Sequence, residues 1–543
     1  MSSLRLLAAS NVTRVATPQV SWRALAPVVI LLVGGIVLLT VASLTRKRAS
    51  TTWYTPFTVV VAAAAALSIV PLWARVQGWD KLLWIDLPHH PRGPFSTVAG
   101  MVGVDGFSLF VAGVVCASVI LAALLAGSYL RREDLNGPEF FALLLLAGAG
   151  GVILAMANDF IVLFLGLETL SLAAYILTAM HLRRAQSQES GIKYFVLGAF
   201  SSAFLLYGIA LVYGATGSTN FITIRNYFGS TNGGAVAGSV PIHDGLLLVG
   251  LVLVIVGLGF KVAAVPFHFW NPDAYDGAPT PAVAFMAGAV KAAAFAAFVR
   301  VFVLTFPNYV SDWRPVVWTI AVLSMVFGAV MAIVQTNVKR TLAYSSINHA
   351  GFILMAVGAA SATGNSAVLF YVFAYAFMVA GAFGVVGVVS RKGDGHTTID
   401  DYRGLSRSNS VLAGVMALFL LAQAGIPFTS GFFAKFYAID AVVGRHADWI
   451  GVIAMLSSAV AAFLYLRIVV VMYLGPTDEV PATPRLRVPF GTKLALGICF
   501  VVTLGAGIAP DVVVSLTDHG RPYLVEAPAP TPPPAGSASG SGS

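Results

Sequence analysis

Four charged residues lie inside long apolar stretches of the sequence: Glu168, Lys261, Lys291 and Lys435. A charge at the centre of a membrane-spanning helix costs roughly 2.5–3.5 kcal/mol on insertion scales, whereas one leucine or isoleucine recovers only about 0.3–0.6 kcal/mol. Packing does not require such residues, so their presence indicates function. A carboxylate and several amines held in a low-dielectric interior can exchange protons, and these residue types therefore predict a proton relay.

Glu168 is the one acidic residue deep in these stretches, and we expect it to control the proton on Lys261. If the carboxylate and the amine approach to about 4 Å at an effective dielectric near 20, they attract each other by about 4 kcal/mol. A glutamate that moves toward or away from this lysine would then decide whether the lysine keeps its proton. Lys291 and Lys435 would pass the proton onward along the middle of the membrane.

The alternative role for a basic residue in such a stretch is snorkelling, in which a long side chain extends to the membrane surface. Snorkelling suits Lys193 and Arg300, which lie near the ends of their stretches, and also Arg467. It does not suit Lys291, which lies at least about eleven residues, or roughly 16 Å, from either end of its stretch.

Two histidines leave alternatives open. His349, in the stretch "AYSSINHAGF", is either a proton carrier or a buried structural histidine. His268, in "VPFHFW", is either a relay group or a polar plug. Asp273 and Asp276, in "NPDAYDGAPTP", are expected to cap a turn rather than to bind a metal.

The composition indicates what surrounds these residues. The 543 residues are 58% hydrophobic and only 10% charged, whereas soluble domains carry about 25% charged residues. The chain is therefore predicted to be an all-α polytopic membrane protein in a lipid bilayer. Its net charge of +9 is spread over short loops, which favours contact with a membrane surface and not with nucleic acid.

The sequence offers no means of holding a redox cofactor or a nucleotide. Its two cysteines, Cys116 and Cys499, lie in apolar stretches without a CxxC partner, which excludes a cysteine-ligated iron–sulfur cluster and a disulfide framework. The glycine-rich stretch at 229–239 lacks the lysine and hydroxyl of a phosphate-binding loop and is predicted to be a flexible loop. We therefore expect no cofactor and no metal in this chain.

The apolar pattern predicts about fourteen transmembrane helices. They lie near residues 24–44, 54–74, 104–130, 138–157, 159–180, 189–214, 244–270, 280–305, 316–335, 341–360, 365–390, 409–443, 448–474 and 494–515.

The seventh and twelfth of these spans are interrupted, around Pro266 and around Gly425 and Pro427. A broken helix is tolerated in a membrane only where its freed backbone groups face protein or a watery cavity. The breaks lie five spans apart, and because five is odd the second unit crosses the membrane in the opposite direction. This predicts two inverted five-helix repeats, each containing a broken helix near a functional centre.

The predicted organisation has six parts. They are an N-terminal extension (1–23), helices one to three (24–137), a first repeat (138–310), a second, inverted repeat (311–475), helix fourteen (476–516) and a Pro/Gly/Ser-rich tail (517–543). With both termini on the outer side, the inner loops hold sixteen Lys and Arg and the outer side holds ten. The positive-inside rule therefore favours that orientation.

At these residues the sequence resembles subunit N of the bacterial proton-pumping NADH:quinone oxidoreductase, respiratory complex I. The resemblance runs from about residue 103 to 473 and is carried by "LFLGLETLSLAAYIL", "SGIKYFVLGAF", "VGLGFKVAAVPFHFWNPDAYDGAPTPAVAF", "GAVKAAAF", "QTNVKRTLAYSSINHAGF", "DYRGL" and "AGIPFTSGFFAKFY". It implies fourteen core helices with two inverted five-helix units, in agreement with the count from the apolar pattern.

The resemblance also implies roles for single residues. Glu168 is similar to the family's glutamate that pairs with Lys261, Lys291 to its connecting lysine, Lys435 to the lysine at the second broken helix, and His349 to its span-ten histidine. The implied partners are the other complex I membrane subunits, especially the K-type and M-type subunits. FMN, iron–sulfur clusters and quinone would belong to partner subunits, and the location would be the bacterial inner membrane.

Two other functions remain open from the sequence. The same lysine and glutamate pattern occurs in Mrp-type cation/proton antiporter subunits and in membrane subunits of energy-converting hydrogenases. The charges could instead belong to a structural membrane scaffold, in which they only fix helix packing.

Overall fold

Nearly every segment of the computed structural model is helical. The structure describes residues 20–45, 51–79, 81–82, 85–86, 92–135, 137–229, 244–474 and 486–526. The first nineteen residues of the predicted N-terminal extension, most of the predicted tail and nearly all of the glycine-rich loop lie outside these residues.

The helices follow one another with short connections. They are α1 (Trp22–Leu44), α2 (Tyr54–Gln77), α3 (Gly106–Arg132), α4 (Glu139–Ala155), α5 (Phe160–Thr178), α6 (Ala185–Thr216), α7 (Phe221–Gly229), α8 (Asp244–Val262), α9 (Trp270–Gly277), α10 (Thr280–Phe285), α11 (Lys291–Phe298), α12 (Val310–Ile333), α13 (Val338–Gly358), α14 (Ala362–Val389), α15 (Leu405–Ser408), α16 (Ser410–Ala424), α17 (Ser430–Val443), α18 (Asp448–Tyr473), α19 (Phe490–Ile508) and α20 (Pro510–His519).

Two small antiparallel hairpins and a few short helical segments complete the described elements. The hairpins pair β1 (Lys81–Leu82) with β2 (Ile85–Asp86) and β3 (Phe95–Thr97) with β4 (Val102–Val104). The 3₁₀ turns are η1 (Thr51–Trp53), η4 (Pro307–Tyr309), η5 (Lys392–Asp394) and η6 (Asp400–Tyr402), and the π-helical segments are η2 (Met286–Val290) and η3 (Val299–Thr305).

Each of the fourteen predicted spans coincides with a helix or a pair of helices. Among the described residues, eleven helical stretches are long and apolar enough to cross a membrane. The other three predicted spans coincide with α4, with α16 and α17 together, and with α13, whose 21 residues include the buried polar run Ser345, Ser346, Asn348 and His349. The all-α membrane architecture predicted from the sequence is therefore confirmed.

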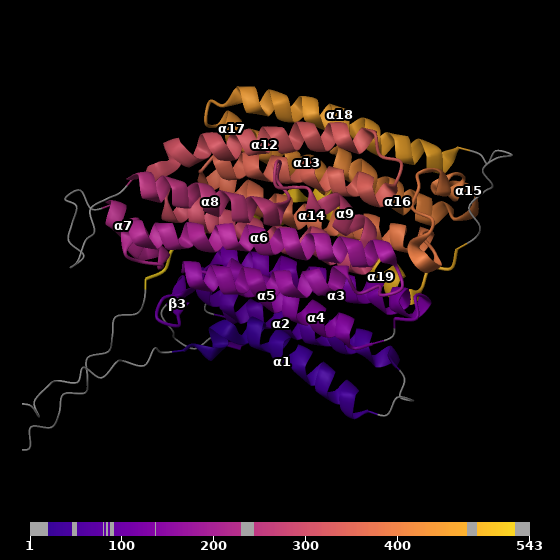
Figure 1. Ribbon diagram of the computed structural model, residues 1–543, viewed down its shortest axis with the longest axis horizontal. Coiled ribbons are helices and arrows are strands. Elements are labelled where there is room, and N and C mark those ends of the chain that lie inside the picture. Colours follow the sequence, from indigo (N-terminus) through magenta and orange to yellow (C-terminus); the bar gives the residue numbers. More distant parts are fainter. Residues whose placement is uncertain are drawn as a thin grey trace, which may run out of the picture.

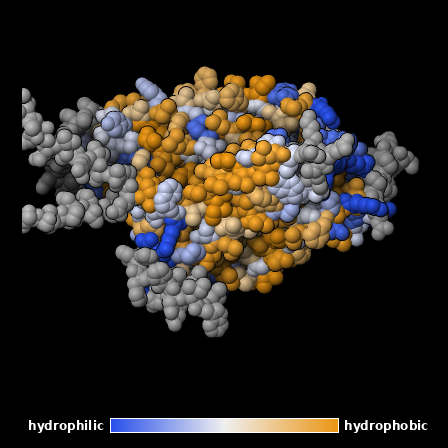
Figure 2. Space-filling model, turned by 90° about the horizontal axis from the view of Figure 1, so that it is seen from below, coloured by the Kyte–Doolittle hydropathy of each residue, from blue (hydrophilic) through white to orange (hydrophobic). Residues whose placement is uncertain are grey.

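The long helices run roughly parallel to one another (Figure 1). The N-terminal helices α1 and α2 lie at one edge of the bundle and α18 lies at the opposite edge. Apolar side chains cover the middle of the face shown in Figure 2, and hydrophilic side chains gather at the two ends of the helices. This distribution is that of a protein whose middle meets hydrocarbon and whose ends meet water and lipid headgroups.

Both predicted helix breaks are present. The helix α8 ends at Val262 and α9 begins at Trp270, while α16 ends at Ala424 and α17 begins at Ser430. The second break starts at Gly425, whose φ of +93° is left-handed and therefore favours glycine. The breaks thus lie where the prolines and glycines of the sequence placed them.

The helices of the two halves pack in the same order. In the first half α4 packs against α5, α5 against α6 and α6 against α8; in the second half α12 packs against α13, α13 against α14, and α14 against α16 and α17. This correspondence is what two repeated five-helix units would produce. The boundaries of the units at residues 138–310 and 311–475 stay a prediction.

The stretch Thr280–Thr305 crosses the buried centre of the bundle. It is one continuous helix in which α10 and α11 alternate with the π-helical segments η2 and η3. Such segments are rare and often lie at functional sites. Lys291 is the first residue after η2, so the irregular turn directly precedes the lysine that is too deep to snorkel.

The C-terminal part of the described chain packs on the bundle. Beyond α19 the chain turns at Pro510 into α20, and the segment 520–526 then contacts the start of α3 and the end of α4. The backbone N–H of Tyr523 donates to Asp105 at 2.7 Å, and the Asn158 amide donates to the carbonyl of Val525 at 3.1 Å. The first residues of the predicted tail thus make polar contacts with the bundle, and the boundary at residue 517 stays a prediction.

Candidate functional site

Glu168 and Lys261 come from α5 and α8, which both pack against α6, but they do not form a direct ion pair. Lys261 is buried, and its Nζ donates a hydrogen bond to the Tyr175 hydroxyl at 2.6 Å. Glu168 is only partly buried and accepts a hydrogen bond from the Ser202 hydroxyl of α6. Tyr175 follows Glu168 by seven residues, or two helical turns, and thus lies on the same face of α5.

The two groups nevertheless act on each other through space. The charge of Glu168 reaches both Lys261 and the Tyr175 hydroxyl. The Tyr175 hydroxyl lies against Gly198 of α6, and a side chain there would overlap it. Ser202, the partner of Glu168, lies one turn further along the same helix. Hydroxyl groups therefore take the place of the expected close ion pair.

Lys291 is buried at the centre of the bundle and bonds to α13. Its Nζ donates to the backbone carbonyl of Ser346 at 2.7 Å and also contacts the hydroxyl of the same residue. No carboxylate lies within ion-pair distance of this amine among the described residues. The lysine is thus held by neutral oxygen atoms, which leaves its proton free of a fixed counter-ion.

His349 lies at the centre of a polar cluster on the same helix. Its Nδ1 is 2.7 Å from the Tyr371 hydroxyl of α14, and its Nε2 is 3.1 Å from the Tyr465 hydroxyl of α18. The Tyr465 hydroxyl is in turn 2.5 Å from the Ser345 hydroxyl, which donates to the side-chain oxygen of Gln423 at 3.4 Å. The charges of Lys291 and Lys435 both act on the imidazole.

Lys435 bonds to the second helix break. Its Nζ donates to the carbonyl of Ala424, the last residue of α16, at 2.9 Å and to the Ser458 hydroxyl at 2.8 Å. The break frees this carbonyl from helical hydrogen bonding, and the lysine satisfies it. Ala424 directly follows Gln423, so the polar cluster around His349 ends one residue before the carbonyl that binds Lys435.

The polar contacts therefore form two groups. One follows α13 and the second break, where the contacts of Lys291, of His349 and of Lys435 lie next to one another without a hydrogen bond between them; the other holds Glu168 and Lys261. In the described part of the chain no direct contact joins Lys261 to Lys291, although α8 and α11 pack against each other.

His268 takes part in neither group. Its ring packs against Phe269 and Phe327 at centroid distances of 4.6 and 4.7 Å. Its buried Nδ1 has no hydrogen-bond partner among the described residues. The geometry is that of a ring set among aromatic side chains beside the first break.

Several residues of the site were not predicted from the sequence. They are hydroxyl and amide side chains that contact the predicted residues: Tyr175, Ser202, Ser345, Ser346, Tyr371, Gln423, Ser458 and Tyr465. The run "YSSINH" on an otherwise apolar helix was a signal for two of them, because polar groups in a membrane helix face a protein partner. The others are single hydroxyls on helices far apart in the sequence.

Arg300 corrects the snorkelling interpretation. Its side chain is fully buried and forms an ion pair with the equally buried Asp105 at 2.7 Å, and its Nε donates to the carbonyl of Ala155 at 2.7 Å. Asp105 also caps the N-terminus of α3 by accepting from the backbone N–H of Ser108. Arg300 is therefore an internal tie between helices, whereas Lys193 is exposed and pairs with Glu189 and Asp273 as a surface residue does.

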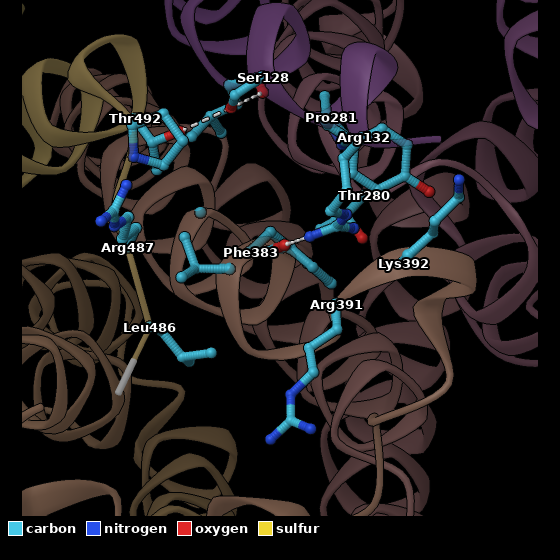
Figure 3. A pocket seen from close by; sticks show the side chains of 16 residues that line it. Ser128, Arg132, Thr280, Pro281, Phe383, Arg391, Lys392, Leu486, Arg487 and Thr492 are labelled. Carbon is cyan, nitrogen blue, oxygen red and sulfur yellow. Dashed lines mark hydrogen bonds between the residues drawn. The ribbon is translucent and has the colours of Figure 1, made fainter. Parts of the chain in front are cut away.

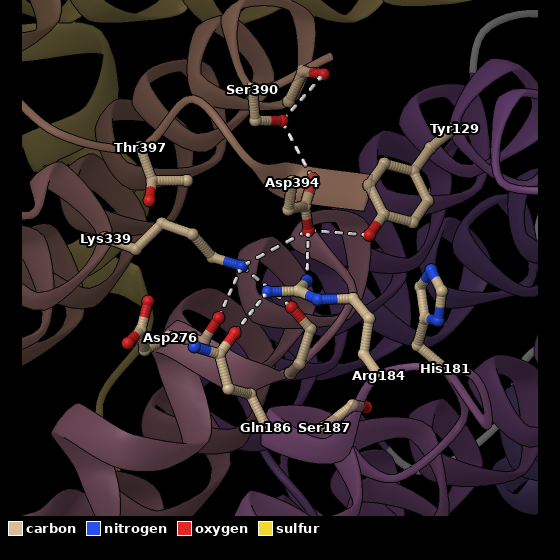
Figure 4. Close-up of polar contacts among 12 residues, drawn as sticks. Tyr129, His181, Arg184, Gln186, Ser187, Asp276, Lys339, Ser390, Asp394 and Thr397 are labelled. Atoms are coloured by element: carbon tan, nitrogen blue, oxygen red, sulfur yellow. Dashed lines mark hydrogen bonds and ion pairs between the residues drawn. The ribbon is translucent and has the colours of Figure 1, made fainter. Parts of the chain in front are cut away.

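A second polar cluster, the Asp394 cluster (Figure 4), contacts the end of α3, whereas Asp105 lies at the start of that helix. The buried Asp394 carboxylate accepts from Tyr129 at 2.7 Å and from Ser390 at 2.8 Å, and it lies 3.0 Å from Arg184 and 3.5 Å from Lys339. Burial opposes ionisation, but the charges of Lys339 and Arg184 and the hydrogen bonds outweigh it and hold the pKa of Asp394 below its ordinary value.

The Asp394 cluster reaches Asp276 and Asp273 as well. Lys339 donates to the backbone carbonyl of Asp276 at 2.9 Å, and Arg340 pairs with the Asp273 carboxylate at 2.8 Å. These aspartates were expected to cap a turn, and they instead tie α9 to the start of α13. Within the residues that the structure describes, no group of three His, Cys, Asp or Glu side chains is placed to hold a metal ion.

Comparison with known proteins places this geometry in a family. The sequence matches the family described as "NADH:quinone oxidoreductase/Mrp antiporter, TM" over residues 157–461. It is 45% identical over 403 residues to a NADH-quinone oxidoreductase subunit N of Streptomyces griseus, covering 72% of this chain and 71% of that protein. It is 42% identical over 415 residues to a subunit N of Solibacter usitatus, covering 76% of this chain and 83% of that protein.

Solved structures agree with the match found from the sequence. A chain of respiratory complex I from Thermus thermophilus with bound aureothin superposes with a TM-score of 0.72 at 30% identity, covering 91% of this chain and 99% of that chain. A chain of the Mrp complex from Dietzia superposes with a TM-score of 0.76 at 21% identity, over 92% of this chain and 96% of that chain, and shows a shared fold alone. The protein is thus a multi-pass membrane protein whose expected partners are other complex I subunits, and it belongs to the family of NADH-quinone oxidoreductase subunit N.

Proposed function

We propose that the chain translocates protons in NADH-quinone oxidoreductase by a relay through Glu168, Lys261, Lys291, His349 and Lys435. The observation that carries this proposal is a row of buried polar groups along α13: Ser346 binds Lys291, and the His349 cluster beside it extends to Gln423, the residue before the second helix break. Quinone reduction in other subunits would supply the energy. Moving one charge against roughly 100 mV costs about 2.3 kcal/mol, which this chain cannot provide by itself.

The chemistry of this row suits proton transfer. A serine or tyrosine hydroxyl can accept one hydrogen bond and donate another. Neutral imidazole does the same with its two ring nitrogens. Lys291 and Lys435 stand at the two ends of the row as groups that can hold a proton. Glu168 acts on Lys261 through space, so a displacement of either group would change how firmly Lys261 keeps its proton.

Transfer between Lys261 and Lys291 needs a bridging group, because the described side chains leave a gap there. Water is the natural bridge, since first-shell waters link protein polar groups almost as well as a direct hydrogen bond. His268 would then serve as a polar plug beside the first break or as an accessory relay group.

The ends of the relay suggest where the partner subunits bind. Glu168 is partly exposed on α5, and Lys435 lines a cavity of about 760 Å³ between α16, α17 and α18. We infer that a K-type subunit covers the first site and an M-type subunit the second. FMN, iron–sulfur clusters and quinone would be held by other subunits. The location would be the bacterial inner membrane, with both termini on the outer side.

The test is proton pumping by the purified complex in liposomes, with NADH oxidation measured in parallel. Replacing a group that transfers a proton slows that step by about 10²–10⁴-fold, so a Lys291→Met complex should lose the protons that this subunit contributes per NADH. Lys493→Met is the matched control, because that lysine is exposed at the start of α19. An unchanged ratio of protons to NADH in the Lys291→Met complex would favour a structural scaffold.

Purification of the complex separates the proposal from an antiporter. A subunit of NADH-quinone oxidoreductase should co-purify with flavin, iron–sulfur clusters and NADH oxidation activity. Sodium/proton exchange in liposomes that lack those components would instead assign the chain to the antiporter branch.

A further inference from the structure

A cavity of about 360 Å³ opens near the end of the helices that carries the Asp394 cluster (Figure 3). Its walls come from the last turns of α3 and α14, the first turn of α10 and the segment that leads into α19. Its volume lies in the range of small-molecule sites, roughly 300–1,000 Å³. The cavity has no part in the relay.

Four basic residues line this cavity: Arg132, Arg391, Lys392 and Arg487. No aspartate or glutamate is among its described lining residues. Figure 3 shows Arg391 and Arg487 on different sides of the cavity. The lining therefore carries concentrated positive charge that its own walls do not neutralise.

Two of these cations already have partners. Arg132 donates to the carbonyl of Gly387 at 2.6 Å and pairs with Glu133 at 2.8 Å, while Lys392 pairs with Asp134 at 2.7 Å.

The other two cations have no acidic partner in the part of the chain that the structure describes. Arg391 makes only a 3.5 Å contact to His396 among the described residues, and its Nε is buried without a hydrogen-bond partner. Arg487 is exposed and makes no hydrogen bond or ion pair with any residue in the described part of the chain.

Besides the hydroxyl side chains of Ser128, Tyr129, Thr280 and Thr492, the rest of the wall is apolar. Its apolar residues include Leu125, Pro281, Phe383, Val388 and Pro489. Positive charge at the helix ends thus lies next to an apolar cavity wall. A free anion would use the charge but leave the apolar wall exposed, whereas a phospholipid uses both. Basic pockets between the ends of membrane helices are a known setting for anionic lipid headgroups.

A second cavity supports a lipid. It has a volume of about 370 Å³, shares Ser128 and Pro489 with the first, and is lined mainly by apolar groups that include Val59, Leu124 and Phe490. The two cavities flank the start of α19. An acyl chain could follow the apolar lining of each.

We propose that this pair of cavities binds one anionic phospholipid, with its phosphate between Arg391 and Arg487 and its acyl chains along the apolar walls. Such a lipid would join α3, α14 and α19, which are far apart in the sequence. It would also neutralise the unpaired charge in the cavity.

The experiment compares lipid bound to the purified complex in the wild type and in an Arg391→Gln/Arg487→Gln variant. Each basic residue near an anionic lipid contributes about 1 kcal/mol, or about fivefold in affinity, so the double variant should bind phosphatidylglycerol about 25-fold more weakly. A phosphatidylglycerol with a photoreactive acyl chain, supplied to delipidated complex, should crosslink to peptides that contain Leu125 or Phe383 in the wild type and not in the variant.

Three control measurements show whether crosslinking depends on this cavity and on an anionic lipid. Arg183→Gln removes one exposed arginine from the loop between α5 and α6 without touching the cavity, and it should crosslink as the wild type does. Phosphatidylcholine with the same acyl chain should crosslink weakly. An excess of inorganic phosphate should leave phosphatidylglycerol crosslinking unchanged, and its complete displacement by phosphate would assign the site to a free anion.

Two further variants keep the proposal testable if the double variant fails to assemble. Arg391→Lys/Arg487→Lys retains the charge and should retain the lipid. Gly387→Leu fills the cavity and keeps every charge; a Cβ at that position meets only Thr280, at ordinary contact distance. Unchanged phosphatidylglycerol crosslinking in the leucine variant or in the glutamine double variant would overturn the proposal.

Discussion

Replacing Asp394 by asparagine tests how far one buried carboxylate holds the bundle together. Asp394 belongs to the turn after α14, and its partners come from α3, from the loop between α5 and α6, and from α13. The carboxylate and the Lys339 side chain are both fully buried. Asparagine keeps the volume and can keep the contact with Ser390, so the change removes charge without leaving a cavity.

The expected loss in the free energy of unfolding follows from the cations that remain after Asp394 is replaced. Without the carboxylate, Lys339 and Arg184 face each other with no negative partner at the centre of the cluster. Removing one partner of a buried ion pair costs about 3–5 kcal/mol. Since about 1.4 kcal/mol corresponds to a factor of ten, the ratio of folded to unfolded protein at equilibrium falls by about two to four orders of magnitude relative to wild type.

The assay is the rate at which the detergent-solubilised protein loses its folded form on heating, because large membrane proteins seldom unfold reversibly and a rate is then the meaningful quantity. The Asp394→Asn protein should unfold at least several-fold faster at any given temperature. The matched control is Asp134→Asn, which removes an exposed carboxylate from the same end of the bundle and should leave the rate nearly unchanged.

A second substitution tests the cause. Adding Lys339→Met to Asp394→Asn removes the uncompensated ammonium and should recover much of the lost stability, because a buried pair replaced by neutral groups is often tolerated. The reasoning is refuted if Asp394→Asn unfolds at the wild-type rate, or if the added Lys339→Met worsens the loss.

The stability that Asp394 contributes depends on pH in one direction only. The folded-state pKa of Asp394 lies below the ordinary value of 3.8, so the carboxylate stabilises the fold above the ordinary pKa and this contribution is lost as the pH falls through the lowered one. The difference between wild type and Asp394→Asn should therefore be constant from about pH 5 to about pH 8 and shrink only below about pH 4.

Three further substitutions test the relay and the helix ties. Tyr175→Phe removes the hydroxyl that accepts a hydrogen bond from the amine at the end of α8, a bond worth about 1.5–3 kcal/mol, and should lower proton translocation in liposomes about tenfold or more with assembly intact. Arg300→Met leaves Asp105 buried without its counter-ion and should cost about 3–5 kcal/mol, measured as faster thermal inactivation. Gly431→Ala places a methyl group against a backbone carbonyl of α16 and should lower both pumping and stability, whereas Gly414→Ala, with open space around it, should change neither.

The spans, the two breaks and the isolated charges could be predicted because each leaves a strong local signal in the sequence. About twenty apolar residues in a row are typical of a membrane span, proline and glycine interrupt a helix wherever they stand, and a central charge such as Lys291 is too costly to be incidental. Each of these features depends on residues that are close together in the sequence.

The contacts of those charges could not be predicted from the sequence because they join helices that are far apart along the chain. Lys291 bonds to Ser346, 55 residues away, and Arg300 to Asp105, 195 residues away. A serine or an aspartate at a helix end has several common roles, such as capping, so neither residue identifies its partner. The same limit made Arg300 look like a snorkelling residue, since its distance from the end of a span says nothing about an acid on another helix.

The π-helical segment before Lys291 gives this helix two possible registers. In a π turn the backbone hydrogen bonds span five residues instead of four, so η2 holds one residue more than an α-helix would need for the same rise. Successive residues of an α-helix are rotated by about 100°, and relaxing η2 into regular helix would turn Lys291 by about that angle relative to α10. Deleting Ala289 would therefore leave a better-formed helix whose lysine points away from Ser346, so that the irregular turn sets the direction of this side chain.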